Sequence, residues 1–218
     1  MSGVLEVAAV SKVFRAGGPG GEAVRAVDDV SLKMPDEPAV LSLVGESGSG
    51  KTTLARLILG LLRPTQGTVR VGDYEVSQLG VVGLDLSDVA GKYHNAFSGG
   101  QLQRLSVARA LIPKPKLIVA DEPVSALDAS LRMTVVNLFA KLRDTLGISF
   151  VYVTHDLSTA YYISDQVAIM HRGKVVEAGA ANRVLTRPEH DYTRRLVAAI
   201  PQIGVKWDES APETQGVH

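Results

Sequence analysis

The stretch VLSLVGESGSGKTT, from Val40 to Thr53, decides the fold. Its first five residues form a short apolar run, which is typical of a strand buried in a parallel sheet. Gly45 to Thr52 then match the pattern G-x-x-x-x-G-K-[ST] at every fixed position. Apolar residues at helical spacing continue from Thr52 to Leu62. A strand, a glycine-rich loop and a helix in this order predict a phosphate-binding P-loop.

Each residue type in the loop has a physical reason. Glycines let backbone N–H groups turn toward phosphate oxygens, and the helix that begins near Lys51 directs its positive end at the anion. Lys51 is expected to reach the β- and γ-phosphates, and the Thr52 hydroxyl to ligate Mg²⁺. The alternative, a glycine-rich turn that happens to contain a lysine, does not account for the flanking strand and helix. The predicted ATP contacts in this stretch are Gly45, Glu46, Ser47, Gly48, Ser49, Gly50, Lys51, Thr52 and Thr53.

Strands and helices alternate after the loop, which predicts an α/β fold with a mainly parallel sheet. Before the loop, closely spaced β-branched segments predict an antiparallel β unit. Its expected strands are Leu5–Phe14, Val24–Val27 and Val30–Met34. Beyond the loop we expect strands at 67–71, 117–120 and 148–154, helices at 101–111, 131–146 and from Leu157, and a hairpin around Arg172 and Gly173.

Two acids and a histidine follow predicted strands. Asp121 and Glu122 end an apolar strand, where one acid can hold Mg²⁺ and the other can deprotonate the attacking water. We assign Asp121 to the metal and Glu122 to the base. His155 follows the strand that ends at Thr154, so it is expected at the same sheet edge, as a contact of the γ-phosphate. Alone, such residues are more often helix caps or loop residues, and the P-loop favours the functional interpretation.

Composition excludes several classes. The 218 residues carry 23 basic and 23 acidic side chains and no cysteine, so disulfides, cysteine-bound zinc and thiol nucleophiles are excluded. A formal net charge of zero makes an electrostatic nucleic-acid binder improbable, and no nucleic acid is expected as a partner. No apolar run approaches the roughly 20 residues of a membrane-spanning helix, so a membrane role requires a partner protein.

Several further motifs together resemble the ATP-binding subunits of ABC transporters. Phe97–Gln101 is similar to the family's signature motif, Ser125–Asp128 to its D-loop, and His155–Asp156 to its H-loop. Phe14 lies where the family places an aromatic residue that stacks on adenine. The motifs occur in family order, and the resemblance covers about residues 3 to 200. A helix cap followed by a flexible glycine pair would explain Ser98 to Gly100 structurally, but not Gln101 or the motif order.

The resemblance implies a P-loop ATPase that works in a head-to-tail dimer with two bound ATP molecules. In that dimer Ser98, Gly99, Gly100 and Gln101 would contact the ATP of the opposite subunit, with Asp128 as the D-loop residue. It further implies Mg²⁺ as cofactor and a peripheral location at the cytoplasmic face of the cell membrane. The implied partners are a second ATPase subunit, identical or not, transmembrane permease subunits and an extracytoplasmic solute-binding protein.

A weaker signal concerns the transported solute. The stretch from His190 to Leu196, with Ile200 and Pro201, resembles the C-terminal part of oligopeptide, dipeptide and nickel importer ATPases. An ordinary amphipathic C-terminal helix is the alternative. The resemblance favours import of peptides or a related small solute.

The chain departs from the family in one place. Lys51 and Ser98 are only 47 positions apart, several dozen fewer than the family normally has, so a Q-loop glutamine and most of the helical subdomain are expected to be missing. We therefore expect an ATPase domain at 1–205 with a reduced helical and signature region at about 79–112, and a flexible tail at 206–218. Two alternatives to a transport ATPase stay open: a regulatory or remnant subunit that binds ATP but couples poorly, and a soluble ABC ATPase outside transport.

Overall fold

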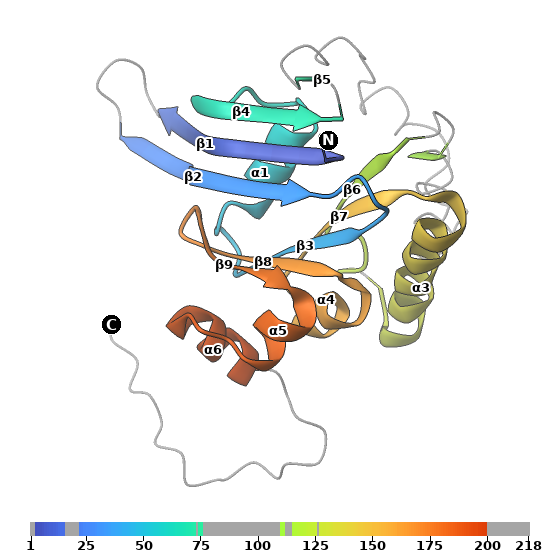
Figure 1. The fold of residues 1–218 in the computed structure, drawn as a ribbon. Helices are drawn as coiled ribbons and strands as arrows, with labels where there is room; N and C mark the ends of the chain where they lie inside the picture. Colours follow the sequence, from blue (N-terminus) through green and yellow to red (C-terminus); the bar gives the residue numbers. More distant parts are fainter. Residues whose placement is uncertain are drawn as a thin grey trace, which may run out of the picture.

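The structure, a computed structural model, describes residues 3–15, 22–72, 74–75, 110–111, 115–125 and 127–199. Two strands come first in the chain, and both strands and helices follow them (Figure 1). In chain order they are β1 (Leu5–Arg15), β2 (Ala23–Met34), β3 (Val40–Val44), α1 (Lys51–Ile58), β4 (Gln66–Val71), β5 (Tyr74–Glu75), β6 (Leu117–Asp121), α3 (Ala129–Leu146), β7 (Ser149–Thr154), α4 (Leu157–Ile163), β8 (Gln166–His171), β9 (Lys174–Ala180), α5 (Ala181–Thr186) and α6 (Asp191–Ala198).

A five-stranded sheet in the order β6-β7-β3-β8-β9 forms the centre. Strands β6, β7, β3 and β8 pair in parallel, and β9 closes one edge by antiparallel pairing with β8. Every residue of β3 and of β7 is buried, as a strand covered on both faces requires. The expectation of an α/β fold with a mainly parallel sheet is confirmed.

The alternation of side chains along each central strand separates two faces of this sheet. On β7, Val151 and Val153 join the core beneath the N-terminal sheet, while Phe150 and Tyr152 join the core against α3. The aromatic ring of Phe139, from α3, lies 5.2 Å from that of Phe150, within the range in which tilted aromatic pairs attract. Because successive side chains of a strand point to opposite faces, β7 packs against a layer on each side of the sheet.

A second sheet, in the order β2-β1-β4-β5, is antiparallel. Sequence patterning predicted two short strands at 24–27 and 30–34, and this was wrong, because the structure has one strand from Ala23 to Met34. Register shifts opposite Val10 and Lys12 let β2 stay paired across the polar Asp28 and Asp29. Asp29 has a positive φ of 50°, so the polar pair marks a bulge rather than a turn.

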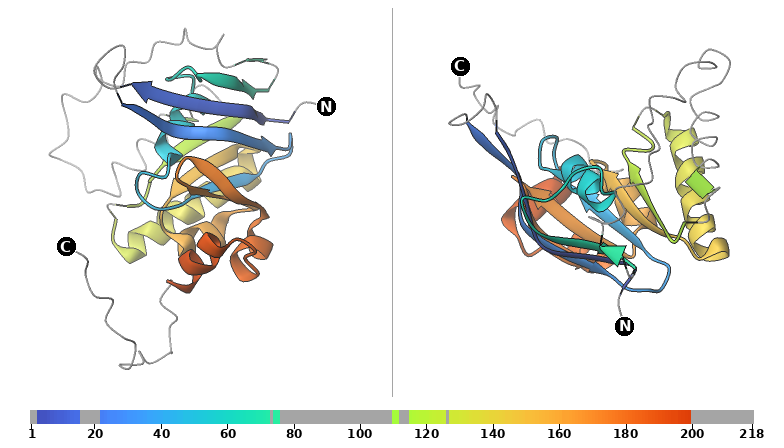
Figure 2. Two further views of the ribbon diagram at one scale, coloured as in Figure 1. Left: turned by 90° about the vertical axis from the view of Figure 1, so that its left-hand side faces the viewer. Right: turned by 90° about the horizontal axis from the view of Figure 1, so that it is seen from above.

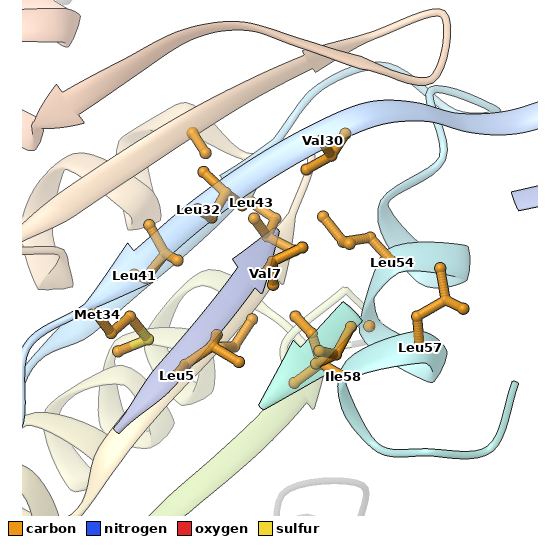
Figure 3. Packing of buried hydrophobic residues seen from close by; sticks show 14 of the residues in the cluster. Leu5, Val7, Val30, Leu32, Met34, Leu41, Leu43, Leu54, Leu57 and Ile58 are labelled. Carbon is orange, nitrogen blue, oxygen red and sulfur yellow. The ribbon is translucent and has the colours of Figure 1, made fainter. Parts of the chain in front are cut away.

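Helix α1 lies between the two sheets, and the remaining helices cover the other face of the central sheet (Figure 2). Leu54, Leu57 and Ile58 of α1 pack with Leu5 and Val7 of β1 and with Leu41 and Leu43 of β3 (Figure 3). Each such side chain contributes about 1.5–3 kcal/mol when fully buried. The helix that follows the P-loop is thereby fixed against both sheets.

Some boundaries differ from the sequence expectation. Helix α1 ends at Ile58 instead of Leu62, because Gly60 takes a positive φ of 71° and breaks the helical ladder. Apart from Ala110 and Leu111, the predicted helix 101–111 and the reduced region 79–112 lie outside the described residues, as does the tail 206–218. Those domain boundaries stay predictions. Within the described part, no helix combines the length and apolarity needed to cross a membrane.

Candidate functional site

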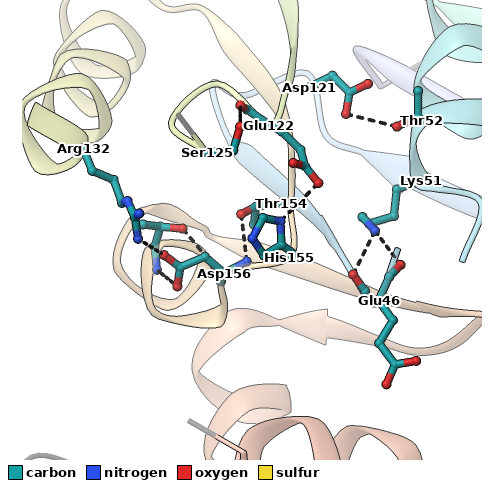
Figure 4. Close-up of polar contacts among 12 residues, drawn as sticks. Glu46, Lys51, Thr52, Asp121, Glu122, Ser125, Arg132, Thr154, His155 and Asp156 are labelled. Carbon is teal, nitrogen blue, oxygen red and sulfur yellow. Dashed lines mark hydrogen bonds and ion pairs between the residues drawn. The ribbon is translucent and has the colours of Figure 1, made fainter. Parts of the chain in front are cut away.

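The carboxyl ends of three neighbouring parallel strands bring the predicted site residues together (Figure 4). Val44, the last residue of β3, pairs with Thr154 of β7, and Asp121 of β6 pairs with Val153. The residues that follow these positions are therefore Gly45, Glu122 and His155, all at one sheet edge. Sheet edges of this kind are where open α/β folds bind ligands.

Lys51 lies at the start of α1 with its ammonium turned back into the loop. Its Nζ donates to the carbonyl oxygens of Gly45 and Glu46, each at 2.8 Å, and the residue is only 5 % exposed. Burial lowers the pKa of Lys51, while the carboxylates of Glu122, Asp121 and Glu46 oppose that lowering. A buried cation held by carbonyls and surrounded by acids is suited to neutralise phosphate charge.

Two glycines of the loop lie against backbone from other elements. A Cβ on Gly45 would come 2.2 Å from the carbonyl oxygen of Met170, on β8. A Cβ on Gly50 would come 2.2 Å from the carbonyl oxygen of Ala26, on β2, and Gly50 has a φ of 103°. No real Cβ fits at that distance, so both positions need glycine for a close backbone approach.

The glycines predict a contrast between two alanine substitutions. Gly50→Ala should abolish nucleotide binding and lower the unfolding free energy by more than Gly48→Ala, because the Ala26 backbone must shift. Gly48 also has a positive φ, 78°, but nothing lies within 4 Å of its Cβ position, so only the conformational cost of about 1–2 kcal/mol applies. Denaturant unfolding of both variants measures the difference, and equal losses would contradict the steric explanation.

Thr52 and Asp121 face each other across the loop. The Thr52 hydroxyl is 3.4 Å from Oδ1 of Asp121, and both side chains are solvent-accessible. A hydroxyl and a carboxylate are hard oxygen donors of the kind that Mg²⁺ takes, together with water and phosphate oxygens. Nearby, the buried Ser49 hydroxyl has no hydrogen-bond partner among the described residues. The donor chemistry at this end of α1 therefore fits a magnesium ion with a phosphate ligand.

Glu122 and His155 contact each other directly. Nδ1 of His155 lies 3.1 Å from Oε1 of Glu122, and both side chains are partly exposed. Glu122 has a φ of 46°, rare for a residue other than glycine. The Glu122 N–H donates to the Val153 carbonyl at 2.9 Å, and the Glu122 carbonyl accepts from the Ser125 hydroxyl at 3.0 Å. These bonds hold the residue in a strained conformation with its carboxylate toward His155, and such strain is typical of functional positions.

A small hollow of about 30 Å³ opens beside this pair, which is room for a water molecule. Arg132, on α3, lies on its wall: one guanidinium nitrogen donates to Asp156 at 2.9 Å and another to the Leu127 carbonyl at 3.4 Å. Asp156 in turn caps α4 by accepting from the N–H groups of Ser158 and Thr159. Arg132 thus joins the segment before α3 to the segment that carries His155.

Asp128, the predicted D-loop residue, caps the N-terminus of α3. Its Oδ1 accepts from the Leu131 N–H at 2.9 Å and from the Ser130 hydroxyl at 2.8 Å. The Leu131 N–H is the main reason why the pKa of Asp128 is lowered. The structure therefore shows a capping role, and a role toward a second subunit stays a prediction.

Phe14 lies near the C-terminal end of β1. Its side chain is 41 % exposed, with the Lys12 ammonium 5.3 Å from the ring centroid. Phe14 pairs with Val24 on β2, two residues from the Ala26 carbonyl that Gly50 approaches. An exposed ring at this place is available for stacking, and its role toward adenine stays a prediction. The signature residues Ser98, Gly99, Gly100 and Gln101 lie outside the described residues.

Sequence reasoning missed three residues that hold the site. Gly173, in the β8–β9 turn, donates its N–H to the Ser49 carbonyl at 3.0 Å. Tyr192, on α6, accepts from the Glu46 N–H at 3.2 Å, and Arg132 makes the bridge described above. Gly173 belongs to the expected hairpin, and Tyr192 belongs to the C-terminal stretch that resembles importer ATPases, but neither signal indicated a contact with the loop.

One family model matches part of the chain. A family model described as "ABC transporter" matches the chain in two overlapping pieces, residues 27–88 and 75–125. The two pieces overlap at residues 75–88, which lie between Lys51 and Ser98.

Curated relatives extend the match to most of the chain. Oligopeptide transport ATP-binding protein OppF of Streptococcus mutans is 35 % identical over 255 positions, which cover 91 % of this chain and 82 % of the relative. Peptide transport system ATP-binding protein SapF of Salmonella typhimurium is also 35 % identical, with 89 % and 92 % covered. Oligopeptide transport ATP-binding protein OppD of Mycobacterium tuberculosis is 36 % identical, but the chain spans only 38 % of it. The first alignment has 255 positions and includes 91 % of the 218 residues of this chain, which is about 198, so about 57 of its positions have no residue of this chain opposite them and that relative carries internal residues that this chain lacks.

Solved structures agree on the fold. A dimeric ATP-binding cassette in a post-hydrolysis state, bound to ADP and Pi, superposes with a TM-score of 0.66 at 25 % identity and covers 81 % of this chain and 98 % of its own. A cassette in its ADP conformation gives a TM-score of 0.73 over 91 % of the chain, and at 21 % identity it supports the fold alone.

Proposed function

Because the chain belongs to the ABC transporter ATP-binding family, whose cassettes are ATPases, we propose that it binds and hydrolyses ATP as the energy-coupling subunit of a transporter that imports peptides or a related small solute. The observation that carries the proposal is the sheet edge where the P-loop, Asp121, Glu122 and His155 meet. The peptide-transport names of its relatives support the class of solute.

In this proposal the chain's own groups divide the work. The P-loop from Gly45 to Thr53 binds the triphosphate through backbone N–H groups, and Lys51 neutralises the β- and γ-phosphates. Glu122 takes a proton from the water whose oxygen attacks the γ-phosphorus, while the bond from that phosphorus to the β,γ-bridging oxygen breaks and ADP leaves. His155, 3.1 Å from Glu122, orients that carboxylate and approaches the γ-phosphate. Phe14 stacks on the adenine ring.

Magnesium fits the oxygen donors that the structure brings together. We propose that the Thr52 hydroxyl holds the ion and that Asp121 holds it directly or through water, since these oxygens are 3.4 Å apart. The ion supplies positive charge to the β- and γ-phosphates when it is bound with ATP. The residues around it keep that place polar and accessible.

The proposed partners follow from the family. A second ATPase subunit would bring its signature segment to this chain's ATP, while Ser98–Gln101 of this chain would serve the other nucleotide. Asp128 would lie near that contact. Permease subunits would hold the pair at the cytoplasmic face of the membrane, with an extracytoplasmic solute-binding protein as a further component. The dimeric cassette structure among the fold neighbours supports the paired arrangement.

A second candidate function rests on the short spacing. Lys51 and Ser98 are 47 positions apart, and about 57 of the 255 positions in the first relative's alignment have no residue of this chain opposite them. In this alternative the chain binds ATP but couples poorly, because closure over the phosphates requires the helical region to position the signature. A misplacement of about 1 Å can reduce a rate around 10²-fold.

The ATPase rate with and without membranes that contain the cognate permease separates the two candidates. The second candidate, which rests on the short spacing, predicts Mg-ATP binding with slow hydrolysis and no stimulation by the permease. Strong permease-stimulated turnover would instead support the energy-coupling role and show that the short segment is a working variant. Mg-ATP binding below detection by calorimetry would contradict both candidates.

A further inference from the structure

One peptide unit of the P-loop is held from both sides. The carbonyl oxygen of Gly45 accepts a hydrogen bond from the Lys51 ammonium at 2.8 Å. The N–H of Glu46, which belongs to the same peptide unit, donates to the Tyr192 hydroxyl at 3.2 Å. Because a trans peptide directs its carbonyl and its N–H in opposite directions, Lys51 and Tyr192 lie on opposite sides of it. Rotation of this peptide would break both bonds.

Tyr192 is itself firmly placed. It is 4 % exposed, and its ring stacks on the His171 ring with centroids 4.0 Å apart and planes at 29°. His171 ends β8, next to the turn whose Gly173 N–H donates to the Ser49 carbonyl. The β8–β9 hairpin therefore contacts the Tyr192 ring through His171 and the P-loop through Gly173.

The segment that leads into α6 is anchored by a buried carboxylate. Glu177, on β9, is 8 % exposed and accepts from the backbone N–H groups of Glu189 and His190, at 3.0 and 3.1 Å. The His190 imidazole then caps α6 by accepting from the Tyr192 N–H at 3.1 Å. The phenol thus reaches the loop from a helix start that is fixed to the central sheet.

We propose that Tyr192 is a positioning residue for the phosphate site. Its hydroxyl fixes the orientation of the Gly45–Glu46 peptide, and this orientation determines where the Lys51 ammonium lies. This inference rests on the proposed function, and it assigns the C-terminal helix a part in nucleotide binding. The phenol accepts from Glu46, so its role is to satisfy and orient an N–H that faces away from Lys51. Burial raises the pKa of Tyr192, which is consistent with a neutral phenol.

Tyr192→Phe tests the proposal, because it removes the hydroxyl and keeps the ring on His171. We expect Mg-ATP and Mg-ADP to bind about 5- to 140-fold more weakly, the range for one buried donor left unpaired. Calorimetric titration of the full chain measures both. Amide exchange followed by NMR on the nucleotide-free chain should show faster exchange at Glu46, with the N–H groups within α6 still protected. A merely structural tyrosine would not change exchange at Glu46 selectively.

Tyr161→Phe is the matched control, since Tyr161 lies on α4, is 53 % exposed and should bind nucleotide like the wild type. If Tyr192→Phe folds normally and matches that control in both affinities and in Glu46 exchange, the positioning role is wrong and the proposed function stands. If the wild type itself binds no Mg-ATP, the proposed function fails, and the exchange at Glu46 alone still decides whether Tyr192 holds the peptide.

Discussion

Glu122→Gln is expected to reduce ATP turnover by about 10²–10⁴-fold, the range for a lost general base, while Mg-ATP affinity stays near that of the wild type. The amide keeps an oxygen that can face His155 Nδ1, where the carboxylate now lies at 3.1 Å. The contact between residue 122 and His155 is therefore retained, and only the basic carboxylate is lost. Turnover under saturating Mg-ATP, measured by phosphate release, tests this, and an ATP-bound dimer should accumulate.

Glu37→Gln provides the control for this substitution. Glu37 is an exposed carboxylate in the segment between β2 and β3, so the variant should turn over ATP at the wild-type rate. If Glu122→Gln also retains that rate, another group activates the water, and the role assigned to Glu122 is wrong.

The second large effect concerns Lys51. Lys51→Ala should weaken Mg-ATP binding by roughly 30- to 5,000-fold, because truncating one member of a buried charge pair costs about 2–5 kcal/mol. Lys51 is 5 % exposed and its ammonium donates to two loop carbonyls, so the substitution removes a buried cation from the loop. Isothermal titration with Mg-ATP measures the loss.

Lys141→Ala is the matched control for the charge change, since Lys141 is exposed on α3. It should bind Mg-ATP like the wild type. Unchanged affinity in Lys51→Ala, with normal folding, would mean that the loop does not bind the phosphates and would remove the basis of the proposed function.

Much of the central fold could be predicted from sequence because its signals are local. The buried strand from Val40 to Val44 was predicted with its observed bounds, since a continuous apolar run before a glycine-rich loop has few other interpretations. The hairpin around Arg172 and Gly173 was also expected, and Gly173 has the positive φ of 81° that its turn requires. The long β2 was not predicted, because Asp28 and Asp29 resemble a turn unless the pairing with β1 is known.

The candidate site was predicted to a similar degree. The residues at the ends of β3, β6 and β7 were named from sequence because parallel strands place their carboxyl ends together. The backbone contacts of Met170, Ala26 and Gly173 with the loop were not predicted, since backbone atoms carry no side-chain signal. The roles of Phe14, Asp128 and Ser98–Gln101 toward nucleotide or a second subunit remain predictions.

The sequence by itself determined the family, the P-loop and the residue types available for phosphate, magnesium and water chemistry, because each depends on spacing within a short stretch. Only the tertiary structure decided which distant groups support them. Tyr192 and Glu46 are 146 positions apart and share one hydrogen bond, and Arg132 joins Leu127 to Asp156 across two elements. Such contacts arise when packed layers close, and the free energy that selects them is that of the whole core rather than of any local pattern.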